Sequence, residues 1–234
     1  MTFSNKTFIV TGAAGNVGSA LAHLLASRGA RVVAVDSLQA PLEAVVATLD
    51  NSASHLALPG VDLTDPDACA RLIERVTAAF GRIDGVGTTV GGFAMAPLAE
   101  AGPEQWDLMF DLNVRTTWNI YRAAVPPIRA AGGGSLVGIG SAAGLRGSGQ
   151  MAAYSATKSA VMRLTESLAD ELRDDRIRVN AVLPTTIDTP QNRAAMPGAD
   201  TSRWVKPAEV AEAMAFLLSD SASAVSGVLL TVGH

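Results

Sequence analysis

The chain has 234 residues, of which 48% are hydrophobic and 17% charged, with a formal net charge of -4 at pH 7. Such a chain can bury a large core, and its length fits one α/β domain over residues 1–234. Its 18 basic side chains are scattered rather than striped, which excludes a nucleic-acid footprint and a polybasic membrane patch, so a small molecule is the expected partner.

The cysteine usage and the first residues bear on location. Cys69 is the only cysteine and has no metal-ligating neighbours in the sequence, which favours a small buried hydrophobic residue in a reducing cytoplasm and argues against a metal site. MTFSNKTFIVTG lacks a basic segment followed by a long apolar one, and nowhere do 18 apolar residues run together. We therefore expect an unexported, cytoplasmic protein without a membrane span.

Short apolar segments alternate with longer helical patterns along the chain. Continuous β-branched runs without strict polar alternation are typical of parallel strands buried on both faces. The expected strands are TFIVTG, ARVVAVD, LALPGVDL, IDGVGTTVGG, SLVGIGS, IRVNAVLP and VSGVLLTVG, separated by the helical patterns GNVGSALAHLLASRG, PLEAVVATLDN, PDACARLIERVTAAFG, residues 103–131 and AYSATKSAVMRLTESLADELR. The alternation predicts a Rossmann-type, doubly wound parallel sheet of about seven strands with helices on both faces, and the glycines at 132–134 predict a helix-ending turn.

The first expected strand runs into TGAAGNVG, residues 11–18. Gly12, Gly15 and Gly18 would permit a tight turn, a close backbone approach to a pyrophosphate and close helix packing, while the helix N-terminus supplies N–H donors. Asp36 follows 18 residues after Gly18 at the end of VVAVD, where its carboxylate would accept both ribose hydroxyls. This context predicts a dinucleotide site.

Two acidic residues refine that prediction. A carboxylate at Asp36 would repel the 2′-phosphate of NADP, and no Arg or Lys stands beside it in VDSLQA, so we favour NAD. Asp62, in GVDLTD, would lie near an adenine and could accept a bond from its amino group. The alternative for Asp62 is a helix N-cap, although Asp65 is better placed for that task.

AAYSATKSAV, residues 152–161, contains a pair of side chains that could carry chemistry. Tyr154 precedes Lys158 by four residues, so a helix places both on one face. Ser141 ends the expected strand SLVGIGS, and Asn113 interrupts a helical pattern in which it is a poor helix former. Open α/β sheets bind ligands at such strand ends, which favours an active site over an ordinary helix surface.

Through TGAAGNVG, DLNV around Asn113, Ser141, YSATK and RVNAVLP, the sequence resembles the short-chain dehydrogenase/reductase family over essentially its whole length. The resemblance implies that Tyr154 is the acid in reduction and the base in oxidation, and that Lys158 lowers its pKa and holds the nicotinamide ribose. Ser141 would position the carbonyl or hydroxyl, and Asn113 would fix a relay water. An adjacent ammonium stabilises a phenolate, and a phenol that titrates near 10 needs such help at neutral pH. The implied cofactor contacts are Gly12, Gly15, Asn16, Val17, Gly18, Asp36, Asp62, Leu63, Val90, Gly91, Tyr154, Lys158, Pro184, Ile187 and Thr189.

The sequence also departs from the family pattern. Asn16 stands where the commonest branch has its middle glycine, and we expect Asn to preserve the turn because it tolerates left-handed dihedrals. Thr88 to Gly91 replace the usual Asn-Asn-Ala-Gly, Thr185 replaces a Gly after Pro184, and the chain ends on VGH. These departures leave the substrate class open.

A substrate lid is expected over about residues 185–206. Residues 183–204, with VGGF at 90–93, resemble quinonoid dihydropteridine reductases, which typically lack counterparts of Ser141 and Asn113. Two hypotheses therefore remain, a small carbonyl/alcohol oxidoreductase with a similar lid and a quinonoid pterin reductase. Three prolines in the segment exclude one continuous helix, and Gly198 indicates a turn. The expected substrate residues are Phe93, Asn192, Arg193, Met196 and Trp204, although Met196 and Trp204 could instead pack the lid onto the domain.

A third hypothesis is a non-catalytic dinucleotide sensor that keeps the fold without the chemistry. By the family resemblance, the long helices beginning near Pro103 and Met151 would pair across a two-fold axis. Both segments carry more small and apolar residues than one buried face requires. We expect a homotetramer, with a dimer as the second choice.

Overall fold

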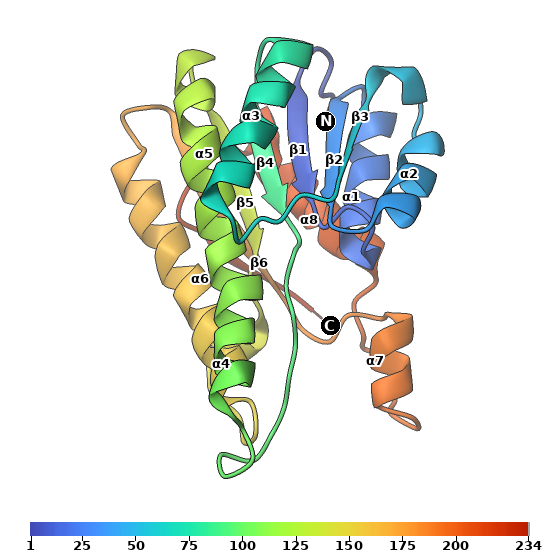
Figure 1. Cartoon of the computed structure of the whole chain (residues 1–234), viewed down its shortest axis with the longest axis vertical. Coiled ribbons are helices and arrows are strands. Elements are labelled where there is room, and N and C mark those ends of the chain that lie inside the picture. Colours follow the sequence, from blue (N-terminus) through green and yellow to red (C-terminus); the bar gives the residue numbers. More distant parts are fainter. Residues whose placement is uncertain (234) are drawn as a thin grey trace.

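The computed structural model describes residues 1–233, and in it one sheet of seven parallel strands runs through the centre of the molecule (Figure 1). The strand order is β3-β2-β1-β4-β5-β6-β7. The strands are β1 Thr7–Thr11, β2 Arg31–Asp36, β3 Leu56–Pro59, β4 Gly85–Thr88, β5 Gly134–Ile139, β6 Ile177–Pro184 and β7 Leu229–Val232. The predicted doubly wound sheet is confirmed. The order reverses between β1 and β4, and in open α/β sheets such a reversal opens a crevice at the carboxyl ends of the strands.

Helices cover both faces of this sheet (Figure 1). Apolar side chains of α1, α2 and α8 form a core on one face, and those of α3, α5 and α6 form a core on the other. The helices are α1 Asn16–Ser27, α2 Gln39–Ala47, α3 Pro66–Phe80, α4 Pro103–Phe110, α5 Thr116–Ala130, α6 Ala152–Glu171, α7 Pro190–Ala195 and α8 Pro207–Leu218. Within the described residues, no helix is long and apolar enough to cross a bilayer.

Three strands are at least four residues shorter than predicted, among them β7, which covers only Leu229–Val232 of VSGVLLTVG. β3 ends at Pro59 because Gly60 follows with φ +70°, which turns the backbone out of the sheet. β4 ends at Thr88, and the rest of TTVGG leaves the sheet. The predicted turn at 132–134 is confirmed, since Gly132 and Gly133 have φ of +94° and +119° just before β5. Cys69 is fully buried, as expected for a small hydrophobic residue.

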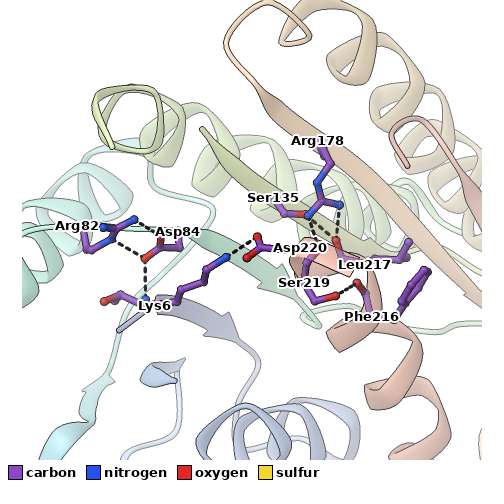
Figure 2. A network of polar contacts seen from close by, with 10 residues as sticks. Lys6, Arg82, Asp84, Ser135, Arg178, Phe216, Leu217, Ser219 and Asp220 are labelled. Carbon is purple, nitrogen blue, oxygen red and sulfur yellow. Dashed lines mark hydrogen bonds and ion pairs between the residues drawn. The ribbon is translucent and has the colours of Figure 1, made fainter. Parts of the chain in front are cut away.

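A network of polar contacts lies at the amino-terminal ends of the central strands (Figure 2). Arg178, at the start of β6, donates to the carbonyl oxygens of Leu217 (2.7 Å) and Ser219 (3.0 Å) at the end of α8. Beside it, Lys6 pairs with Asp220 (2.5 Å), and the Asp84 carboxylate accepts from Arg82 and from the main chain of β1. Since the last carbonyls of a helix have no partners within it, Arg178 supplies what α8 lacks.

Candidate active site

The glycine turn after β1 has the geometry of a phosphate cradle. Gly12 has φ +68°, and a Cβ there would lie 2.8 Å from Thr89 Oγ1. A Cβ at Gly18 would collide with the Gly12 carbonyl oxygen. No side chain caps the N-terminus of α1, where Gly15 is the N-cap residue. The backbone can therefore approach an anion closely here, and the helix end can donate to it.

The expected role of Asn16 in this turn is wrong. Asn16 is the first residue of α1, and the left-handed residue is Gly12. A helical backbone suits any L-residue, so the change from glycine needs no special tolerance. The Asn16 side chain instead reaches across the site, where its Nδ2 donates to Gln191 Oε1 of α7 (3.1 Å).

Asp36 ends β2 directly beside the glycine turn. Its Oδ2 accepts from the Ala14 amide (3.0 Å) and its Oδ1 from the Leu38 amide (3.1 Å). Each carboxylate oxygen can accept a further bond, so the residue keeps capacity for hydroxyl donors. This placement next to the cradle fits a ribose.

Asp62 and Asp65 take separate tasks after β3. Asp65 is the N-cap of α3 and accepts from the Asp67 amide (2.9 Å), which confirms it as the capping residue. The Asp62 carboxylate accepts from the Thr64 hydroxyl (2.7 Å) and amide (2.8 Å), and these bonds lower its pKa. An adenine contact of Asp62 or Leu63 stays a prediction.

Tyr154, Lys158 and Ser141 meet at the carboxyl end of β5. The Ser141 side chain acts to lower the pKa of the Tyr154 phenol, but burial outweighs this effect and raises that pKa. Lys158 is only 5% exposed, and burial lowers its pKa to about 8. Its Nζ donates to the Ile139 carbonyl (3.2 Å) and lies 5.8 Å from the centre of the Tyr154 ring. Lys158 was expected to lower the pKa of Tyr154. In the structure burial is the dominant effect on both groups, so the pKa of Tyr154 is raised and that of Lys158 is lowered.

Asn113 lies in a π-helical turn, η2 (Asp111–Arg115), between α4 and α5. Such turns recur at functional sites, and this one accounts for an Asn within a helical pattern. The buried Asn113 amide accepts from Gly92 N (3.0 Å) and donates to Gly92 O (3.1 Å) and to Thr157 Oγ1 (3.1 Å). Both ends of the side chain thus hold protein groups, and a relay water at Asn113 stays a prediction.

Residues 89–93, which leave the sheet after β4, complete the wall of the site. A Cβ at Gly91 would lie 2.7 Å from Asn113 Oδ1 and 3.3 Å from Lys158 Nζ. The Phe93 ring meets the Tyr154 ring edge to face at 4.8 Å, although Phe93 is 57% exposed. The predicted residues Gly91 and Phe93 therefore adjoin Tyr154 and Lys158, while Val90 is half-buried and packs against the core under α3, α5 and α6. Gly92 and Thr157 were not predicted, since no sequence signal distinguishes them from their neighbours.

Hydrogen bonds and an ion pair among its own residues hold the lid in shape. As predicted, it contains no continuous helix, because α7 spans only Pro190–Ala195 and Gly198 has φ +86°. Thr189 caps α7, and Asn192 Nδ2 donates to Ile187 O (2.8 Å). The Arg193 guanidinium forms two bonds with the Asp188 carboxylate, of 2.5 and 2.8 Å, so it is already paired within the lid.

The remaining lid residues differ in their exposure. Met196 is 39% exposed, Trp204 is half-buried, and Val205 forms a parallel bridge with Ile187. α7 stands on the carboxyl side of the sheet, apart from the two helical layers (Figure 1). Contacts of Pro184, Ile187 and Thr189 with a cofactor, and of Arg193, Met196 and Trp204 with a substrate, stay predictions.

A doubly wound sheet with a glycine cradle at its switch point defines the dinucleotide-binding class of α/β proteins. Residues 6–199 match the family model described as short chain dehydrogenase. The chain therefore belongs to the short-chain dehydrogenase/reductase family, whose members bind a nicotinamide dinucleotide and act on alcohols and ketones.

Individual relatives agree with this assignment. A cis-4-hydroxycyclohexanecarboxylate dehydrogenase from Sinomonas cyclohexanicum is 38% identical over 98% of this chain and 96% of its own length. A cyclopentanol dehydrogenase from Comamonas testosteroni is 31% identical over 98% and 96%. A crystal structure of NAD+-bound xylitol dehydrogenase superimposes with a TM-score of 0.90 at 27% identity, covering 100% of this chain and 99% of that one. These matches give no support to the expected likeness of the lid to quinonoid dihydropteridine reductases.

Proposed function

We propose that this protein is an NAD(H)-dependent oxidoreductase that interconverts a small secondary alcohol and its ketone. The observation that carries the proposal is the meeting of Tyr154, Ser141 and buried Lys158 beside the glycine cradle, at the carboxyl ends of β1, β4 and β5. A phenol can exchange a proton with an alcohol or carbonyl oxygen, and a hydroxyl donor beside it can stabilise the charge that develops on that oxygen.

The roles of the residues follow from their contacts. A bound nicotinamide dinucleotide would supply the hydride acceptor for oxidation and the hydride donor for reduction. In oxidation Tyr154, as the phenolate, would take the hydroxyl proton, and in reduction Tyr154, as the phenol, would donate its proton to the carbonyl oxygen. Ser141 Oγ holds the same oxygen. Lys158 Nζ places its charge at the Tyr154 ring and, with a pKa of about 8, can exchange a proton near neutral pH.

The substrate site has an apolar rim. The backbone amide of Ala96 donates to Gln150 O (2.9 Å), which joins the segment after Phe93 to the segment after Ser141. Phe93, Met95 and Leu145 on these segments are 51–59% exposed. We therefore propose a substrate with an apolar, compact body, and the names of the cyclic-alcohol relatives support this choice.

A substrate panel tests the proposal. NAD+ reduction would be followed with cyclopentanol, cyclohexanol, cis-4-hydroxycyclohexanecarboxylate and xylitol, and NADH oxidation with the matching ketones and quinonoid dihydropterin. Turnover of the cyclic alcohols above xylitol supports the proposal. Turnover of the dihydropterin alone would favour the pterin reductase, and dinucleotide binding without turnover on any compound would favour the sensor.

The preference for NAD depends on Asp36. In the wild-type protein NADH is expected to bind at least about tenfold more tightly than NADPH, because a carboxylate at Asp36 repels the 2′-phosphate of NADPH. Asp36→Ala should reduce the difference between the two affinities, because it weakens NADH binding and removes the repulsion of the 2′-phosphate of NADPH. Calorimetric titration with both dinucleotides measures the two affinities, and Asp67→Ala, which removes an exposed carboxylate outside the expected cofactor contacts, serves as the control. Equal or tighter binding of NADPH by the wild type would contradict the preference.

We also propose a cytoplasmic homotetramer built on α4, η2, α5 and α6. On this surface the single chain leaves three large apolar side chains about half exposed, Trp106, Leu108 and Trp118. An assembly would remove their apolar surface from water. Multi-angle light scattering is expected to give about four times the chain mass of 24.0 kDa. A mass of one chain at micromolar concentration would refute self-association, and a mass of two would favour the dimer.

A further inference from the structure

Thr89, the first residue after β4, contacts the glycine turn through both its backbone and its side chain. Its amide donates to Thr11 O (3.2 Å), which extends the pairing of β1 with β4 by one residue. Its hydroxyl donates to the same Thr11 oxygen (2.8 Å) and lies 3.2 Å from the Gly12 oxygen. The Thr89 hydroxyl has no role in the proposed reaction.

The two carbonyls that the hydroxyl contacts belong to the peptide units on either side of the Gly12 Cα. The orientation of those units is what φ and ψ of Gly12 describe, and φ is +68°. A hydroxyl has one proton, which is shared between two acceptors here. Thr89 therefore holds the one residue of the turn that has a left-handed backbone.

The Gly12 carbonyl in turn fixes the start of α1. It accepts from the Gly15 amide (2.9 Å), and it faces Gly18 so closely that no Cβ fits there. Rotation of the Gly12 peptide would consequently move the N-cap of α1 and the amides that the helix end presents to an anion.

The same segment reaches the catalytic residues at its other end. Gly92 is held by both ends of the Asn113 amide, and the Phe93 ring packs on the Tyr154 ring. Residues 89–93 thus connect the glycine turn to Tyr154 through fixed contacts.

We propose that Thr89 is a positioning residue for the dinucleotide, which acts by setting Gly12 and with it the anion-binding end of α1. The inference goes beyond the proposed reaction, since it concerns cofactor affinity and holds for any substrate. Loss of the hydroxyl should weaken dinucleotide binding about tenfold, the effect of one lost hydrogen bond of ordinary strength.

Three variants separate positioning from general stability. Thr89→Val removes the hydroxyl at nearly constant volume, and Thr89→Ser restores it. Thr88→Val is the matched control, because Thr88 is the neighbouring buried threonine and its hydroxyl lies 3.5 Å from Tyr121 Oη instead of at the turn. Calorimetric titration with NADH and with NADPH is expected to show about tenfold weaker binding for Thr89→Val and wild-type binding, within about twofold, for the other two.

Hydrogen exchange of the protein alone gives a readout independent of turnover. Amides of residues 13–18 should exchange faster in Thr89→Val than in the wild type, while those of β5 and β6 keep their rates. Wild-type affinity in Thr89→Val, or equally weak binding in Thr89→Ser, would overturn the proposal. Failure of the wild type to bind either dinucleotide would instead overturn the proposed function.

Discussion

Tyr154→Phe is expected to lower turnover at least about 100-fold in both directions while NADH affinity stays within about twofold of the wild type. The substitution removes only the phenol hydroxyl, and it keeps the ring that packs edge to face on Phe93. Because the phenol is the only group proposed to move a proton at the substrate oxygen, no neighbour can replace it.

Steady-state kinetics with the best alcohol of the panel, and NADH titration of the same variant, measure the two quantities. Tyr121→Phe is a matched control, since Tyr121 is the only other tyrosine and is buried against Thr88. It should change stability more than turnover. Near-normal turnover in Tyr154→Phe would remove this residue from the catalytic role.

Lys158→Met is expected to abolish activity and yet stabilise the fold. The pKa of Lys158 is about 8 in the folded protein, against 10.5 for an exposed lysine. Below pH 8 the amine is charged in both the folded and the unfolded chain, so the whole burial cost applies, about 3 kcal/mol by the usual conversion of pKa differences. The lost bond to the Ile139 carbonyl offsets about 1 kcal/mol. At pH 7 we expect a net gain of about 1–2 kcal/mol and a loss of turnover of at least about 100-fold.

The pH dependence of stability separates this explanation from a packing effect. Between about pH 8 and 10.5 the unfolded chain binds more protons than the folded one, so the wild type should gain stability as pH rises through this window. Lys158→Met should lose that contribution. Urea unfolding at pH 7 and pH 9 measures it, with Lys6→Met, which removes an exposed ion pair with Asp220, as the control. A destabilised Lys158→Met that keeps the wild-type pH slope would contradict the prediction.

The sequence was sufficient to predict the sheet because its central strands are short apolar runs buried on both faces, as in β1 and β6. The sequence was also sufficient to predict that Tyr154, Lys158 and Ser141 lie close together. Helical spacing and the position of a strand end are local properties of the sequence. Both depend on regular elements, whose periods are visible in one dimension.

What the sequence did not predict depends on contacts between distant segments or on local competition for donors. The left-handed position of the turn fell on Gly12 rather than on Asn16, because Asn16 is already the first residue of helix α1. The ion pair of Arg193 with Asp188, five residues earlier in the lid, was also not predicted. The pKa of Tyr154 was expected to fall, but burial, which only the folded structure reveals, raises it.

The polar network at the amino-terminal edge of the sheet has a consequence for how this protein could acquire new specificities (Figure 2). Arg178, Asp84 and Lys6 tie together β1, β4, β6 and α8 at the opposite ends of the strands from Tyr154 and the lid, about 15 Å away for a five-residue strand. Substitutions in residues 93–98, 144–150 and 190–204 leave these bonds untouched. Laboratory evolution could therefore diversify those three segments together while the network keeps the framework folded.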